Sequence, residues 1–195
     1  AGSPEAVERM LRRLAGPSAR NALAERAALQ TIVDETEQIP FPVEAHDWAF
    51  YTERVRTARY DIDSSALRPW FEAERVLQDG VFFAATQLYG VTFSERDDLA
   101  AYHPGARVFE VRDADGSPVG LYVLDLYTRD SKRGGAWMNA IVSQSRLRGT
   151  APVVVNNLNV PLPGEGEPTL LTLDEVTTLF HEFGHALHGL SATVT

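Results

Sequence analysis

The sequence of 195 residues contains no cysteine. This absence excludes a disulfide scaffold, a thiolate metal site and a thiol nucleophile, and it is compatible with a reducing compartment. No apolar run approaches the roughly 18 residues that a transmembrane helix needs. The polar N-terminal segment shows no signal-peptide pattern either. We therefore expect a cytoplasmic protein with no membrane partner.

Basic residues are scarce relative to acidic ones. The 18 Lys and Arg residues stand against 27 Asp and Glu residues, which gives a formal net charge of −9. Without a basic surface, we expect no nucleic-acid partner. The remaining composition, with 44% apolar and 9% aromatic residues, is typical of a globular chain.

Three regions follow one another along the chain. Residues 1–90 are predicted to be helical, residues 91–170 to form a small sheet with loops, and residues 171–195 to form one helix. No linker divides these regions. We therefore expect a single piece with a mainly α fold and a small, mostly antiparallel β-sheet, an α+β arrangement.

The helical region depends on strong helix formers between Glu5 and Gln38. Gly16-Pro17 is expected to break this stretch into two helices. Further helices are expected over Val43–Ala58 and from about Leu67 to Leu88, with Gly90 as the stop signal. Four aromatic side chains of these helices are expected in the core rather than at a binding surface: Trp48, Tyr51, Trp70 and Phe71.

The sheet is expected to begin with a hairpin. The β-rich runs Arg107–Arg112 and Val119–Tyr127 flank the turn signal Asp113–Gly116. Ala136–Val142 and Pro152–Asn156 are predicted as the third and fourth strands.

The last predicted helix carries a His-Glu-x-x-His pattern. Thr172 and Glu175 have the spacing of a capping box at its start, and the helix is expected to end near Gly189. His181 and His185 lie on one face, so both imidazoles can reach one metal ion at about 2.0–2.1 Å. Glu182 is rotated about 100° around the axis. It can therefore lie beside the metal without binding it, and move a proton from the attacking water to the leaving amine.

A purely structural reading of this pattern is two partly buried histidines beside a surface glutamate. Chance gives the pattern about 0.01 times in a chain of this composition. Gly184 in the middle of the helix suggests close packing at that point. Apolar neighbours on the same helix also favour the metal site: Val176, Leu179, Phe180, Phe183 and Leu187.

His188 shares the helical stripe of His181 and His185. The rise from His181 to His188 is about 10 Å, too far for one ion to bind all three imidazoles on a regular helix. We expect His188 to have a packing or supporting role rather than to be a ligand.

The segment from Phe180 to Gly189 closely resembles the zinc helix of the thimet oligopeptidase family. The resemblance covers essentially all 195 residues and is greatest with the bacterial peptidyl-dipeptidase branch. It implies a zincin-like zinc metallopeptidase, a mostly helical fold with a deep substrate channel, and removal of dipeptides from the C-terminus of oligopeptides. Four other segments carry the likeness: Asp47–Tyr51, Tyr102–Pro104, Arg129–Met138 and Leu173–Leu179.

The resemblance assigns roles to individual residues. It implies that His181 and His185 bind one Zn²⁺ and that Glu182 is the general base. Gly135, Ala136 and Trp137 correspond to a strand beside the cleft that pairs with the substrate backbone, and the two glycines before it permit close approach of an extended peptide. Without the resemblance, this segment reads as an ordinary loop before an ordinary strand.

Two basic residues lie just before that segment. Lys132 and Arg133 could clamp a substrate carboxylate, but exposed Lys-Arg pairs are usually solvated charge. We leave them out of the expected site.

One part of the family pattern is missing from the sequence. The third zinc ligand of the family is a Glu on a following helix, and this sequence ends at Thr195 before such a helix. We therefore expect a piece of a metallopeptidase catalytic domain, truncated at its C-terminus and inactive alone. Two alternatives stay open: an endo-acting oligopeptidase of the same family, and a non-catalytic helical binding module.

Overall fold

The computed structural model describes residues 2–60 and 64–193. They divide into two compact units, residues 1–63 and 64–195. Whether both units belong to one catalytic domain stays a prediction. The expected three regions also include residues 1, 61–63, 194 and 195, which lie outside the described residues.

The first unit is a pair of helices. α1 (Pro4–Thr36) and α2 (Trp48–Tyr60) enclose a small core of Leu29, Val33, Val43 and Tyr51. Trp48 packs against this core. The predicted core positions of Trp48 and Tyr51 are therefore confirmed.

The predicted break at Gly16-Pro17 is wrong. α1 is continuous, with Pro17 inside it. A proline disfavours helical geometry in the preceding residue through contact with that residue's backbone N–H and Cβ. Gly16 has no Cβ, and the flanking strong helix formers continue the helix on both sides.

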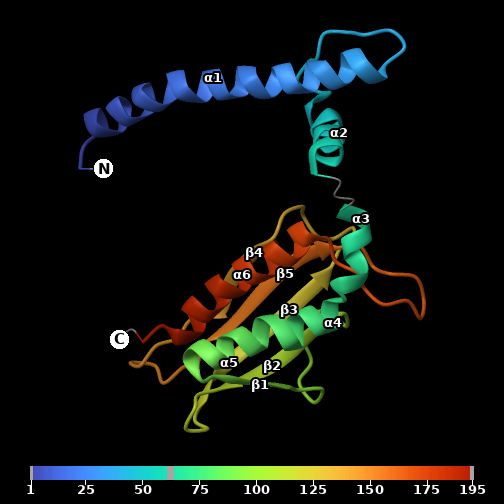
Figure 1. Cartoon of the computed structure of the whole chain (residues 1–195). Helices are drawn as coiled ribbons and strands as arrows, with labels where there is room; N and C mark the ends of the chain where they lie inside the picture. Colours follow the sequence, from blue (N-terminus) through green and yellow to red (C-terminus); the bar gives the residue numbers. More distant parts are fainter. Residues whose placement is uncertain (1, 61–63, 194–195) are drawn as a thin grey trace. The chain divides into compact units, whose positions relative to one another are not determined.

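The second unit starts with a chain of short helical segments (Figure 1). They end at Gly90, which caps α5 in the left-handed conformation with φ +75°, as the stop signal predicts. Trp70 is 65% exposed, so the expectation that it is a core residue is wrong. In chain order the segments are α3 (Ser64–Leu67), the 3₁₀ turn η1 (Arg68–Trp70), α4 (Ala73–Arg75), the π-helical η2 (Val76–Phe82) and α5 (Phe83–Tyr89).

A five-stranded sheet forms the centre of this unit, in the order β1-β2-β3-β5-β4. The predicted hairpin is confirmed as the antiparallel pair β2–β3, whereas the short β1 was not predicted. The strands are β1 (Thr92–Glu95), β2 (Ala106–Arg112), β3 (Pro118–Tyr127), β4 (Trp137–Val142) and β5 (Val153–Val160).

The sheet is mixed, which corrects the expectation of a mostly antiparallel one. β5 runs parallel to β3 and antiparallel to β4. Turn signals predict pairing between strands that follow one another, but here β5 lies between β3 and β4. Most β5 residues are buried, as is usual for a strand with parallel pairing in the middle of a sheet.

One face of the sheet carries the helices. α6 (Leu173–Ser191), η2 and α5 lie over this face (Figure 1), and their apolar residues join Tyr122, Leu124 and Val154 in the main core. The opposite face has a smaller core of Val108, Val123 and Val155, against which Leu99 and Ala101 pack. Among the described residues, no helix is long and apolar enough to cross a membrane.

Candidate functional site

The helix with the His-Glu-x-x-His pattern has a well-defined start. The Thr172 Oγ1 accepts a hydrogen bond from the Glu175 amide at 3.1 Å, and the Glu175 carboxylate accepts one from the Thr172 amide at 2.7 Å. The predicted capping box is therefore confirmed. From this start, α6 runs without interruption through His181, Glu182 and His185.

The two predicted metal ligands point their rings at one another. The Nε2 atoms of His181 and His185 are 3.1 Å apart, and both residues are exposed. Two nitrogens that bind one tetrahedral zinc ion at 2.0–2.1 Å lie about 3.3 Å apart. The observed spacing therefore fits two positions of a tetrahedral zinc site.

A third protein ligand is not found next to this pair. Across residues 2–60 and 64–193, no group of three or more His, Cys, Asp or Glu side chains is placed to hold a metal ion. The described residues thus bring together the two predicted ligands, and His188 does not join them as a third.

Glu182 lies on the inner side of the same helix. It is 9% exposed, in contrast to the two histidines that flank it. The backbone carbonyl oxygen of Glu182 accepts a hydrogen bond from Nδ2 of Asn156 at 2.8 Å. Asn156 lies on β5 and is fully buried. This bond holds the middle of α6 against the sheet. Asn156 was not predicted from the sequence as a site residue, because a buried Asn has no sequence signature.

A pocket brings most of the predicted site residues together. Ala136, Trp137 and Met138 line it from the β4 side, and Glu182, His185, His188 and Gly189 line it from α6. Its volume is about 540 Å³. Gly135 and His181 are not among its lining residues, although the Nε2 atom of His181 contacts that of His185. The pocket therefore places the predicted general base beside the predicted substrate-binding segment.

β4 is an edge strand of the sheet. One side pairs with β5, with Met138 opposite Asn156 in the register, and among the described residues no strand pairs with its other side. Gly135, just before the strand, has φ +88°, a conformation that glycine adopts without strain. An extended peptide could add to this free edge as a further strand.

Close packing of α6 on the sheet occurs at Gly189 rather than at Gly184. A Cβ atom at Gly189 would lie 2.5 Å from Cε of Met138 and 3.1 Å from Cγ1 of Val154. A Cβ atom at Gly184 would meet nothing within 4 Å. The expectation of close packing at Gly184 is therefore wrong.

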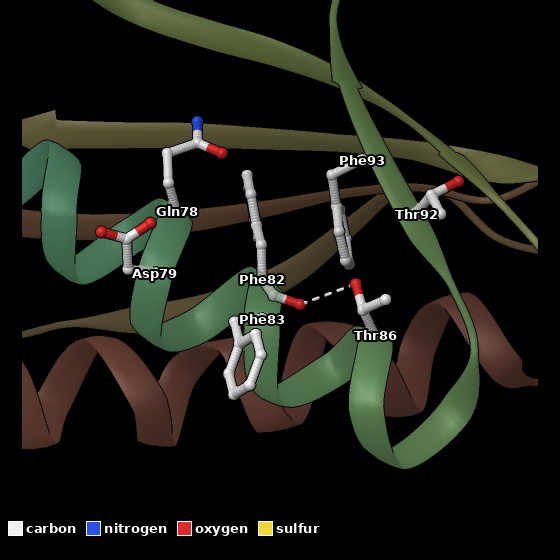
Figure 2. A pocket seen from close by; sticks show the side chains of 7 residues that line it. All are labelled: Gln78, Asp79, Phe82, Phe83, Thr86, Thr92 and Phe93. Atoms are coloured by element: carbon white, nitrogen blue, oxygen red, sulfur yellow. Dashed lines mark hydrogen bonds between the residues drawn. The ribbon is translucent and has the colours of Figure 1, made fainter.

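Figure 2 shows another pocket of this unit, between η2, α5 and β1. The Phe82 and Phe93 rings stack there with centroids 4.2 Å apart, and the Thr86 hydroxyl donates to the backbone carbonyl of Phe82. Among the seven labelled residues, Asp79 has the one ionisable side chain. We therefore assign no catalytic role to this pocket.

Comparison with known proteins identifies the class of protein. A family model described as Peptidase family M3 matches residues 1–195. The chain therefore belongs to peptidase family M3, as the motifs around α6 and β4 lead one to expect.

Individual relatives agree with this assignment. The chain is 47% identical over 192 residues to "Dipeptidyl carboxypeptidase" of Salmonella typhimurium and 46% identical to the protein of that name in Escherichia coli; each match covers 98% of the chain and 28% of the relative. It is 42% identical over 147 residues to "Oligopeptidase A" of Escherichia coli, a match that covers 74% of the chain and 22% of that relative. The chain thus spans less than a third of the length of these relatives.

Proposed function

We propose that a full-length enzyme containing this chain hydrolyses oligopeptides with the help of zinc and releases dipeptides from their C-termini. The observation that carries the proposal is the pocket that Glu182 and His185 share with Trp137 of β4, with His181 in contact with His185. The two imidazole nitrogens have the spacing of zinc ligands, and Glu182 shares a pocket with Trp137.

The ligand residues of this chain are His181 and His185. When bound there, zinc supplies a Lewis acid that polarises the scissile carbonyl and makes water a better nucleophile. Glu182 accepts the proton of the attacking water and then donates it to the leaving amine. Its position on the inner side of α6 directs it toward the pocket between α6 and β4.

The substrate backbone is aligned by Gly135, Ala136 and Trp137. Extended peptides bind to exposed strands through main-chain hydrogen bonds, and β4 offers such an edge. These main-chain hydrogen bonds form with the bound substrate as well as with the transition state, so they contribute mainly to substrate binding.

Catalytic zinc sites usually have three protein ligands, so this site needs one more. Because the described residues hold no three-ligand group, we propose that the third ligand comes from residues outside this chain. The chain alone is then inactive, and the full-length enzyme binds one zinc ion. A cytoplasmic location is a further prediction.

Two other functions remain as alternatives. An endo-acting oligopeptidase is favoured by the 42% identity to a protein named "Oligopeptidase A". A non-catalytic binding module is favoured by the two-ligand site, although the burial of Glu182 in a pocket beside the histidines supports catalysis instead.

The experiment is hydrolysis of one peptide with a free C-terminus and of the same peptide with an amidated C-terminus, by the full-length enzyme. Release of a dipeptide from the free form alone supports the proposal. Internal cleavage of both forms supports the endo-acting alternative. Activity that survives removal of all bound metal by a chelator would exclude a zinc-dependent mechanism.

A further inference from the structure

We propose that Asp125 is a positioning residue that holds the segment leading to the substrate-binding edge of β4. The inference rests on the proposed function, because it concerns how that edge is kept in place for a peptide. Asp125 does not contact the pocket residues directly. It acts through Arg129 and Lys132, which belong to the segment between β3 and β4.

Asp125 is the centre of a buried network of hydrogen bonds. Its side chain is almost fully buried, and each carboxylate oxygen accepts two hydrogen bonds. Arg129 donates to both oxygens at 2.8 Å, Lys132 donates to one at 3.1 Å, and the Tyr102 hydroxyl donates to the other at 2.7 Å. A buried carboxylate is stable only when it is paired and hydrogen-bonded in this way.

These bonds also determine the charge of the carboxylate. Burial by itself raises the pKa of Asp125, but the hydrogen bonds from Arg129, Tyr102 and Lys132 outweigh burial and lower this pKa to about 2. Asp125 is therefore ionised at neutral pH, and its negative charge attracts both Arg129 and Lys132.

Lys132 connects the ends of two strands to the following loop. Its side chain is 4% exposed. It donates to the backbone carbonyls of Asp125 and Tyr127 at the end of β3, and to that of Leu158 on β5. The prediction of a solvated charge is therefore wrong for Lys132. Because its hydrogen bonds go to Asp125 and to backbone carbonyls, Lys132 is an anchor rather than a clamp for a substrate carboxylate.

The other end of the same segment is fixed by Asn159. Its Nδ2 atom donates to the backbone carbonyl of Arg133 at 2.9 Å and to that of Gly135 at 2.6 Å. The segment is thus held at Arg129, Lys132, Arg133 and Gly135. Ala136 and Trp137, which line the pocket, follow directly. Asp125 and Lys132 thus hold one end of the segment that leads to these pocket residues.

This anchor is separate from the contacts that hold α6. Side chains alternate across a strand, so Asp125 lies on the sheet face opposite to Tyr122 and Leu124, which pack in the core beneath α6. α6 is held instead by Asn156 and by packing at Gly189. Loss of the anchor should therefore disturb the β4 edge and leave the zinc ligands in place.

The competing view is that Asp125 contributes to stability alone. Both views predict a lower melting temperature for Asp125→Asn, so stability does not distinguish them. They differ in what happens to folded enzyme well below its melting temperature. At such temperatures, a role in stability alone leaves KM unchanged, whereas a positioning role raises KM. The reason is that the β4 edge binds the substrate and the transition state equally, and loss of such binding raises KM without changing kcat.

The test compares the full-length Asp125→Asn and Lys132→Met enzymes with wild type. We expect KM for an oligopeptide to rise about tenfold in each, with kcat within about twofold, and zinc content to stay at the wild-type level. Amide hydrogen exchange should accelerate in residues 133–142 and stay unchanged in α6. If Asp125→Asn does not fold, Arg129→Gln removes the paired cation from a position that is 24% exposed and is expected to give the same pattern.

The matched control is Glu95→Gln. Glu95 binds Arg107 through both carboxylate oxygens at 2.7 and 2.6 Å, but it lies on β1 at the opposite edge of the sheet. This variant should keep the wild-type KM. The inference would be overturned if KM and amide hydrogen exchange were unchanged in the Asp125 and Lys132 variants. It would also be overturned if these variants lost both kcat and bound zinc. If the wild-type enzyme cleaves no peptide, the proposed function fails, and exchange in residues 133–142 alone then decides whether Asp125 anchors the segment.

Discussion

Asn156 on β5 donates a hydrogen bond of 2.8 Å to the backbone carbonyl oxygen of Glu182 on α6. Asn156 also pairs with Met138 in the β4–β5 register. Asn156 therefore adjoins both β4 and α6, the two elements that line the pocket. The hydrogen bond fixes the position of Glu182, the proposed general base, relative to the sheet. Much of the proposed chemistry depends on that placement.

Replacement of Asn156 by Ala should therefore impair catalysis. The change removes the side-chain hydrogen bond to a carbonyl that keeps its helical partner, at a cost of about 0.5–1.5 kcal/mol in stability, and it frees α6 to shift. We expect kcat of the full-length enzyme to fall roughly 10- to 100-fold. The control is Asn21→Ala, because the exposed Asn21 side chain donates to Glu25 on the same helix of the first unit and is not among the residues that line the pocket. Equal kcat in the two variants would contradict the positioning role of Asn156.

The two glycines of α6 should respond in opposite ways to replacement by Ala. Gly189→Ala introduces a methyl group where Met138 and Val154 are already in the way, and overpacking of this kind costs about 1–3 kcal/mol. Gly184→Ala adds a methyl group in open space and should stabilise the helix by up to about 1 kcal/mol. Chemical unfolding of the 195-residue chain measures both. A stabilising Gly189→Ala would show that α6 does not pack closely at this point.

Zinc affinity of the full-length enzyme should depend on His181 and His185 and not on His188. Loss of either ligand to Ala removes a zinc–nitrogen bond, so we expect affinity to fall by more than about 100-fold. His188→Ala serves as the control, since it removes an imidazole from the same pocket. Titration against a competing chelator measures all three. An equally large loss in His188→Ala would mean that His188 is a ligand.

The free energy of unfolding of the second unit should fall at acidic pH because of Asp125. Its pKa of about 2 in the fold is lower than the value of about 3.9 in an unfolded chain. A lowered pKa stabilises the fold above the unfolded value and loses this effect as the pH falls from about 4 toward 2. The contribution at neutral pH is on the order of 2–3 kcal/mol.

The Asp125→Asn variant isolates this contribution. Wild type should exceed the variant in free energy of unfolding most at about pH 5 and above, and the difference should shrink as Asp125 becomes protonated. Chemical unfolding of both proteins over this pH range measures the difference. A difference that does not change with pH would contradict the ionised, fully paired state of Asp125.

The parts of the site that depend on local spacing could be predicted from the sequence. His181 and His185 are four residues apart, so any helix places them on one face, and the capping box at Thr172 indicates where that helix begins. The hairpin of β2 and β3 is local in the same way. In each case the interacting residues lie within a short stretch of chain.

The parts that depend on long-range contacts could not be predicted. Nothing near β5 indicates that it inserts between β3 and β4, because the turn residues around it would suit sequential pairing equally well. Lys132 has the sequence context of a surface charge, and its burial depends on Asp125, Tyr127 and Leu158. Gly189 is required by Met138 and Val154, which lie far from it along the chain.

The most direct test of the account is the Glu182→Gln variant of the full-length enzyme, assayed for zinc content and for hydrolysis of an oligopeptide. Gln has nearly the same size as Glu but cannot accept the proton. The account predicts one zinc ion per enzyme, as in wild type, and a kcat lower by at least about 100-fold. Retention of most of the wild-type turnover by a zinc-loaded Glu182→Gln enzyme would contradict the role of Glu182 as general base.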